Sequence, residues 1–225
     1  MWYTKRDLYF GVPKFFMSCT LIEIPVPITT PRLIIRPYRD DDAYQLTEAY
    51  LESVNELKPW LTWSHTVSND GLSPLEVEQI FIKKAYAKWL LREELSFALT
   101  LKHDDTIIVG AICLRRINWS VPGMEIRYWL RTSQTGQGYM TEAVDALCHY
   151  AFLQLHAKRI DLMCDESNLR SRAVPQRLGF VQEGVLKNFD RTADCNKLTN
   201  MVVYARYDMQ GLPDLPVAWP GKVSG

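Results

Sequence analysis

Residues 126–143 place two glycines between a predicted strand and a predicted helix. Gly136 and Gly138 allow the backbone to curl so that successive N–H groups point inward. The start of the following helix adds unpaired N–H donors and a partial positive charge. Such a loop favours phosphate binding, but it has neither the Gly-Lys-Ser/Thr of a Walker loop nor the third glycine of a Rossmann fingerprint. Taken alone, the two glycines also fit an ordinary turn.

A second informative stretch covers residues 164–180. A strand is predicted to end there, and a helix follows that stops at Gly179. Asn168 can cap this helix or face a cleft, and Ser171 can belong to the cap or lie beside a reacting atom. A well-capped helix explains the same pattern without any function.

Together the two stretches resemble the GNAT superfamily of acetyl-CoA-dependent N-acetyltransferases. The resemblance is strongest to its branch of ribosomal-protein N-terminal acetyltransferases, the RimJ/RimL type, which residues 30–37 and 184–187 also resemble. It covers residues 29–207 and implies an α+β protein with the GNAT fold. In that fold a mixed, mostly antiparallel central sheet is splayed in a V and flanked by helices.

The resemblance carries the family's binding residues onto this chain. The backbone of Tyr128, Trp129 and Leu130 matches the strand that pairs with the pantetheine arm of acetyl-CoA. Asn168 matches an asparagine near the pantetheine, and Ser171 matches a serine near the thiolate. The family's pyrophosphate loop matches six residues that would offer backbone N–H groups to the diphosphate: Gly136, Gln137, Gly138, Tyr139, Met140 and Thr141.

Acetyl transfer needs a neutral amine, so a general base or a water chain must remove a proton. The resemblance gives two candidate bases, Glu125 before the loop and Asp190 near the end of a later strand. Glu125 could instead pair with Arg127, and Asp190 could be a turn residue beside Arg191. The tyrosine acid that is frequent in the family is missing near Arg177, so departure of the thiolate would depend on Ser171 or on N–H groups.

The resemblance implies direct transfer of acetyl from acetyl-CoA to an amine in a ternary complex. The acceptor it favours is a protein N-terminal amine, as in ribosomal proteins, and a homodimer is expected for this branch. A small amine, such as a polyamine or an aminoglycoside, stays open as the acceptor. Thr135, Met140 and Pro175 depart from the family's usual residues, which leaves a catalytically weak acyl-CoA-binding module as another alternative.

For several other residues, the sequence allows both a functional and a structural role. Cys164 is an acyl carrier or, more commonly, a small buried hydrophobe. His149 and His156 share a helix face, but no carboxylate stands at ligand spacing, so no metal is expected. The aromatic residues that are candidates for the acceptor cleft or for the core are Tyr50, Trp60 and Trp63.

Composition narrows the class further. Hydrophobic residues make up 47% and charged residues 23% of the chain, as in globular proteins. The 26 basic and 26 acidic residues cancel, which argues against bulk attraction to nucleic acid or a membrane surface. The five scattered cysteines contain no CxxC pair, so a reduced, cytoplasmic protein is predicted. No apolar run reaches the roughly 18 residues that span a bilayer.

Periodicity predicts the elements that must position these residues. Helices are predicted to open at Asp40–Asp42 and at Ser73, where Ser73 and Glu76 form a capping box. The full set is strand 32–37, these two helices, strands 96–101, 106–116 and 124–130, a helix through 143–155, strand 159–164, helix 170–178, and strands 180–189 and 198–207. Three parts follow: an N-terminal extension 1–28, a domain 29–207, and an irregular C-terminal tail 208–225 rich in proline and glycine.

Overall fold

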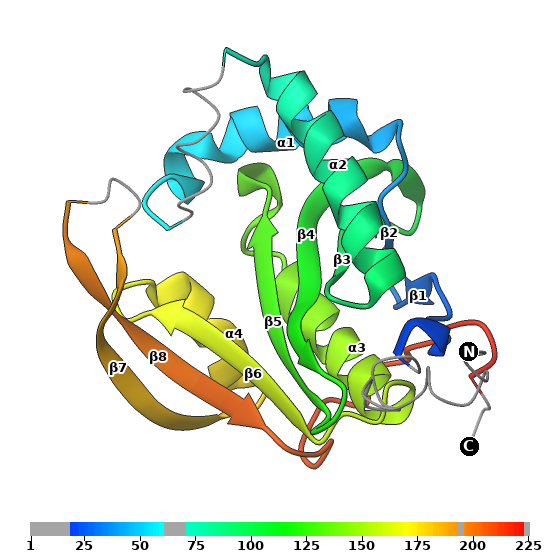
Figure 1. Ribbon diagram of the computed structural model, residues 1–225, viewed down its shortest axis with the longest axis vertical. Helices are drawn as coiled ribbons and strands as arrows, with labels where there is room; N and C mark the ends of the chain where they lie inside the picture. Colours follow the sequence, from blue (N-terminus) through cyan, green and yellow to red (C-terminus); the bar gives the residue numbers. More distant parts are fainter. Residues whose placement is uncertain (1–18, 61–70, 193–195, 223–225) are drawn as a thin grey trace, which may run out of the picture.

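The central sheet has eight strands in the order β1-β2-β3-β4-β5-β6-β8-β7 (Figure 1). The computed structural model describes residues 19–60, 71–192 and 196–222, so Trp63 lies outside it. The strands are β1 Ile28–Thr29, β2 Leu33–Pro37, β3 Leu95–Leu101, β4 Asp104–Asn118, β5 Gly123–Leu130, β6 Arg159–Asp165, β7 Val181–Arg191 and β8 Leu198–Arg206. Each neighbouring pair is antiparallel except β5–β6, which is parallel. This mixed, mostly antiparallel sheet confirms the predicted α+β fold.

Four α-helices flank the sheet in the described part of the chain, with two apolar clusters between them and the strands. The helices are α1 Asp42–Leu57, α2 Pro74–Leu91, α3 Tyr139–Leu153 and α4 Leu169–Arg177. The larger cluster joins α3 to alternate residues of the strands, such as Phe97 and Leu99. The smaller one joins α1 and α2 to residues such as Ala98 and Ile108. In the described residues, no helix is both long enough and apolar enough to cross a membrane.

The parallel pair β5–β6 separates partway along its length. Its register runs only from Gly123 opposite Arg159 to Ile126 opposite Leu162. Beyond that point β5 stays paired with β4 to its end, and β6 stays paired with β8. The two halves of the sheet therefore diverge after Ile126, which produces the predicted V.

Helix α2 starts as its sequence predicts. Ser73 Oγ accepts a hydrogen bond from the Glu76 N–H at 3.3 Å, and Glu76 Oε2 accepts one from the Ser73 N–H at 2.8 Å. Both halves of the capping box are therefore present, and Pro74 occupies the first helical position. The local pattern was sufficient here because all the contacts lie within one turn.

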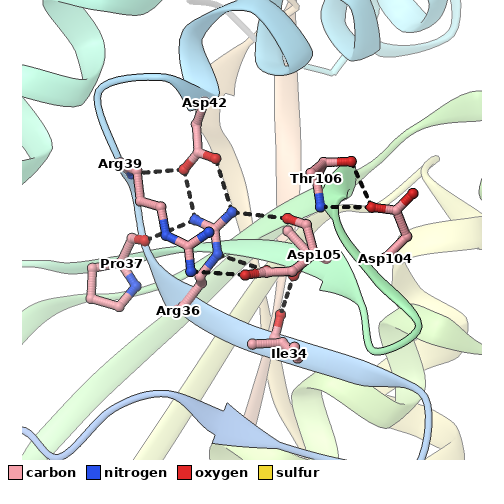
Figure 2. Close-up of polar contacts among 9 residues, drawn as sticks. Ile34, Arg36, Pro37, Arg39, Asp42, Asp104, Asp105 and Thr106 are labelled. Carbon is pink, nitrogen blue, oxygen red and sulfur yellow. Dashed lines mark hydrogen bonds and ion pairs between the residues drawn. The ribbon is translucent and has the colours of Figure 1, made fainter.

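The sequence predicts that Asp40–Asp42 open helix α1 by placing negative charge at its N-terminus, but the structure shows a different arrangement. The N-cap residue of α1, Asp41, makes no side-chain cap hydrogen bond. The buried carboxylate of Asp42 instead accepts hydrogen bonds from both Nη atoms of buried Arg36, at 2.7 and 2.9 Å (Figure 2). Arg36 Nε also donates to Asp105 Oδ1 at 2.8 Å, and the Arg39 N–H donates to Asp42 at 2.7 Å. This network ties the start of α1 to β2 and to the start of β4.

Residues 208–222 contain no helix or strand, yet they pack closely against the rest of the protein. Buried Val217 and Trp219 join the large cluster. The Trp219 ring meets Tyr150 edge-on at 5.1 Å, and its Nε1 donates to Gln154 at 3.1 Å. Ala218 pairs with Thr29 of β1. The core thus draws on side chains beyond residue 207.

Replacing Trp219 by alanine should lower the free energy of unfolding by about 3–5 kcal/mol, because a large buried ring leaves a cavity in the core. Urea denaturation measures the loss. Leu21→Ala serves as the control, since Leu21 is 81% exposed and its truncation should change stability by less than about 0.5 kcal/mol. Equal effects of the two variants would show that residues 208–222 do not contribute to the folded core.

Candidate active site

The divergence of β5 and β6 opens a cleft of about 1350 Å³. It extends from the glycine loop, between the two strands, to the end of α1 and the far ends of β7 and β8. The predicted site residues that line it are Tyr128, Trp129, Leu130, Gly136, Gly138, Tyr139, Met140, Thr141, Asn168, Ser171 and Asp190. Gln137 and Glu125 are not among the described residues that line the cleft.

The glycine loop adopts the backbone form that its two glycines permit. Gly136 and Gly138 have φ values of 78° and 80°, where a side chain is strained. Gly138 is the N-cap of α3, so the first N–H groups of that helix point toward the loop without partners in the helix. Arg177 Nη1 donates to Thr141 Oγ1 at 3.2 Å and places a cation beside these donors. This arrangement suits a phosphate group.

Arg32, just before β2, holds the loop from its other side, a role the sequence pattern did not reveal. Its Nη1 donates to the Gln137 carbonyl at 2.9 Å, and its Nε donates to Glu142 at 2.6 Å. The guanidinium also lies 4.7 Å from the ring centre of Tyr139. Glu142 is buried and accepts a hydrogen bond from the Thr30 hydroxyl at 2.6 Å. The loop is therefore fixed by contacts from residues more than a hundred positions earlier in the chain.

Three side chains meet across the cleft where the V is open. Tyr128 on β5 donates its hydroxyl to the Ser171 carbonyl at 2.8 Å, and Ser171 Oγ lies 3.3 Å from that hydroxyl. Cys164 Sγ, on β6, is 3.1 Å from Ser171 Oγ. Asn168 Oδ1 accepts the Ser171 N–H at 3.0 Å, so Asn168 both lines the cleft and caps α4. Burial raises the pKa of Tyr128, which keeps the phenol protonated.

The two candidate bases occupy different environments. Glu125 is 3% exposed and contacts two guanidinium groups, Arg116 at 3.0 Å and Arg127 at 3.1 Å, with Arg115 at 3.9 Å. The structure therefore contains the Glu125–Arg127 ion pair, which the sequence leaves open as the alternative to a catalytic role. Asp190 lies at the rim of the cleft with an exposed side chain. Asp190 Oδ1 also accepts the Arg191 N–H at 2.8 Å, as in the alternative of a residue paired with its neighbour. Of the two carboxylates, that of Asp190 lines the cleft and that of Glu125 does not.

Of the aromatic candidates for the acceptor cleft, one lines it and one belongs to the core. Trp60 lines the cleft and is 40% exposed, whereas Tyr50 is buried.

The cleft lining also includes Asp145, a buried carboxyl that the sequence did not single out. Burial raises the pKa of Asp145 to about 6, with Arg206 opposing the shift. Its Oδ1 lies 3.6 Å from Nε2 of His149, and neither atom has a hydrogen-bond partner among the described residues. The expectation that no carboxylate lies at ligand spacing from His149 is therefore wrong.

Comparison with known proteins assigns this architecture to a family. The family model described as acetyltransferase (GNAT) domain matches residues 32–181. A ribosomal-protein-serine acetyltransferase of Escherichia coli (strain K12) is 29% identical over 152 residues, which cover 67% of this chain and 78% of that protein. An alanine N-acetyltransferase of ribosomal protein uS5 from the same organism is 29% identical over 167 residues, covering 73% and 82%.

Solved structures share the fold at lower identity. RimL, a ribosomal L7/L12 alpha-N-protein acetyltransferase in complex with coenzyme A, gives a TM-score of 0.72 at 20% identity, covering 83% of this chain and 99% of that one. The microcin C7 self-immunity acetyltransferase MccE, in complex with acetyl-CoA and AMP, gives 0.70 at 20% identity, covering 79% and 93%. The chain belongs to the GNAT acetyltransferase family. It is related at 29% identity to enzymes that acetylate ribosomal proteins.

Alkylation can test whether Cys164 is a reactive nucleophile or a buried thiol. Burial raises its pKa to about 11, so less than about one molecule in a thousand carries the thiolate at pH 7.5. The rate of iodoacetamide labelling at Cys164, followed by mass spectrometry, should rise about tenfold per pH unit up to pH 10. A rate that is already maximal at pH 8 would contradict this environment and revive an acyl-carrier role.

Proposed function

We propose that this protein transfers the acetyl group of acetyl-CoA to the N-terminal amine of a protein, by direct attack within a ternary complex. The observation that carries the proposal is the cleft, which joins the glycine loop at one end to an exposed carboxylate, Asp190, at the other. The relatives named as acetylating serine or alanine of ribosomal proteins support this class of acceptor. A cytoplasmic location and a homodimer belong to the same proposal.

The residues of the loop and of β5 fit the two ends of acetyl-CoA. The N–H groups from Gly136 to Thr141 would bind the diphosphate, and Arg177, which donates to Thr141, would balance its charge. Past Ile126 the edge of β5 has no strand partner in β6. The backbone of Tyr128–Leu130 is therefore free on that side to pair with an extended pantetheine arm. When bound, acetyl-CoA supplies an activated thioester.

The proton transfers fall to groups at the centre and the far rim of the cleft. Asp190 would take the proton from the attacking amine, directly or through water, because its carboxylate is exposed at the cleft. Ser171 would offer its hydroxyl to the departing sulfur, since its Oγ lies in the open part of the V with Tyr128 and Cys164. Glu125 would keep β4 and β5 together by binding arginines.

The acceptor end of the cleft carries both signs of charge. Glu56 and Asp190 face it together with Arg170 and Arg191, and Trp60 adds an apolar surface. The carboxylates favour an ammonium group on the incoming amine, while the arginines and the tryptophan suit a peptide backbone and side chain behind it. This local pattern replaces the long-range attraction that a chain of zero net charge does not provide.

An acetyl transfer assay tests the acceptor class. Thiol release from acetyl-CoA should be fastest with peptides whose free N-terminal residue is serine or alanine, and should vanish when that amine is blocked. Spermidine and an aminoglycoside run beside them represent small amines. Faster turnover of a small amine would replace the protein acceptor, and tight acetyl-CoA binding without turnover of any amine would indicate a binding module.

Gly138→Asp tests whether the glycine loop binds acetyl-CoA. The aspartate would adopt a strained positive φ and would bring a negative charge to the helix N-cap beside the diphosphate. Calorimetry should show acetyl-CoA affinity reduced at least about tenfold. Unchanged affinity would show that the diphosphate does not bind at this loop.

Asparagine and glutamine exchanges separate the two candidate bases. Asp190→Asn should reduce kcat about 10²–10⁴-fold, as is typical for loss of general base catalysis. Asp40→Asn, at an exposed position before α1, is the matched control and should retain kcat. Activity lost in Glu125→Gln but kept in Asp190→Asn would assign the base to Glu125 instead.

A further inference from the structure

One surface of α1 supports the segment that leads into the glycine loop. Glu52 Oε1 accepts the N–H of Ser133 at 2.8 Å, and Glu52 Oε2 accepts Arg131 Nε at 2.5 Å. Ser53 Oγ accepts the N–H of Thr132 at 2.9 Å, and Ser53 has 0% exposure. The two backbone contacts are to the 3-10 turn Thr132–Gln134, which ends two residues before Gly136. Side chains of α1 therefore satisfy backbone donors that the turn cannot pair internally.

The carboxylate of Glu52 is suited to this support. Burial alone would raise its pKa, but the hydrogen bonds from Ser133 and the ion pair with Arg131 outweigh that effect and lower it. The group therefore stays ionised through the neutral range. It binds one backbone donor and one guanidinium at the same time, which fixes both the position and the direction of the turn.

The same helix reaches the acceptor end of the cleft within one further turn. Glu56 and Leu57 line the cleft, and Trp60 follows just after the helix ends. Glu56 Oε2 also receives Arg170 Nη1 of α4 at 3.3 Å. At its other end α1 is held by the buried pair of Arg36 and Asp42. A helix fixed at its start can transmit a displacement of its last turns to the Thr132–Gln134 turn.

We propose that Glu52 and Ser53 are positioning residues that couple the two substrate sites through α1. They hold the coenzyme loop and the acceptor-lining end of the helix in one fixed relation. Binding of the acceptor against Glu56 and Trp60 stabilises the contacts of Glu52 and Ser53 with the turn, and so strengthens binding of acetyl-CoA. By linkage, acetyl-CoA strengthens binding of the acceptor to the same degree.

This inference rests on the proposed function for its substrates, but the contacts can be tested without them. In the protein without ligand, amide hydrogen exchange at Thr132 and Ser133 should be slow. Ser53→Ala should accelerate exchange at Thr132, and Glu52→Ala at Ser133, each about tenfold. Glu48→Ala is the matched control, because this glutamate lies on the same helix, is exposed, and accepts a hydrogen bond from Gln45 of that helix at 3.0 Å.

Kinetics then test the coupling. With acetyl-CoA and a peptide bearing an N-terminal serine, Glu52→Ala should raise both KM values about tenfold and change kcat by less than about twofold. Glu52→Gln keeps one oxygen for the Ser133 N–H but loses the ion pair, so it should fall between the wild type and Glu52→Ala. If Glu52→Ala acted only by a general loss of structure, kcat or the melting temperature would fall, and the KM values of the wild type, Glu52→Gln and Glu52→Ala would not rise in that order.

The outcomes separate this inference from the proposed function. If the peptide is not acetylated at all, the proposed acceptor is wrong, and calorimetry with coenzyme A still compares Glu52→Ala with Glu48→Ala. Equal coenzyme A affinities and equal exchange rates in those two variants would overturn the role of Glu52. Weaker coenzyme A binding in Glu52→Ala, with KM for the peptide unchanged, would overturn the coupling.

Discussion

The parting of β5 and β6 is the constraint on which the site depends. Each strand keeps a longer antiparallel partner on its outer side, β4 or β8, so the short parallel pairing ends without exposing both edges of either strand. The released inner edges carry backbone groups that need a partner. The glycine loop, the start of α4 and the end of β7 all lie around this opening, which makes an otherwise ordinary sheet able to bind an extended ligand.

A second constraint sets where the surrounding helices stand. Arg36 and Asp42 are both buried, and each needs the other because an unpaired buried charge is costly. Such a pair adds little net stability over an apolar one, but its bidentate geometry specifies a single orientation. It fixes the start of α1 against β2, and Arg36 also binds Asp105 at the start of β4. From there the helix runs across the end of β5 (Figure 1), and Glu56 and Leu57 in its last turn line the cleft.

Local sequence signals predicted most of this architecture. The capping box at Ser73, the alternating strands and the two glycines depend on neighbours within a few residues, so periodicity and residue type are sufficient to read them. Contacts between distant segments could not be read in this way. Arg32 binding Gln137 and Glu52 binding Ser133 carry no local pattern. The direction of Glu125, toward arginines and away from the cleft, likewise depends on which face of β5 the helices cover.

The pairing of Thr29 with Ala218 joins positions 189 residues apart. Closing so long a loop costs chain entropy before any contact compensates for it, and distant pairings of this kind slow folding. During synthesis, β1 and the core around Tyr150 stay incomplete until Trp219 has emerged from the ribosome. The core beside α3 therefore gains its last contacts only after residue 219 has been made, although the glycine loop itself is held by residues that precede it in the chain.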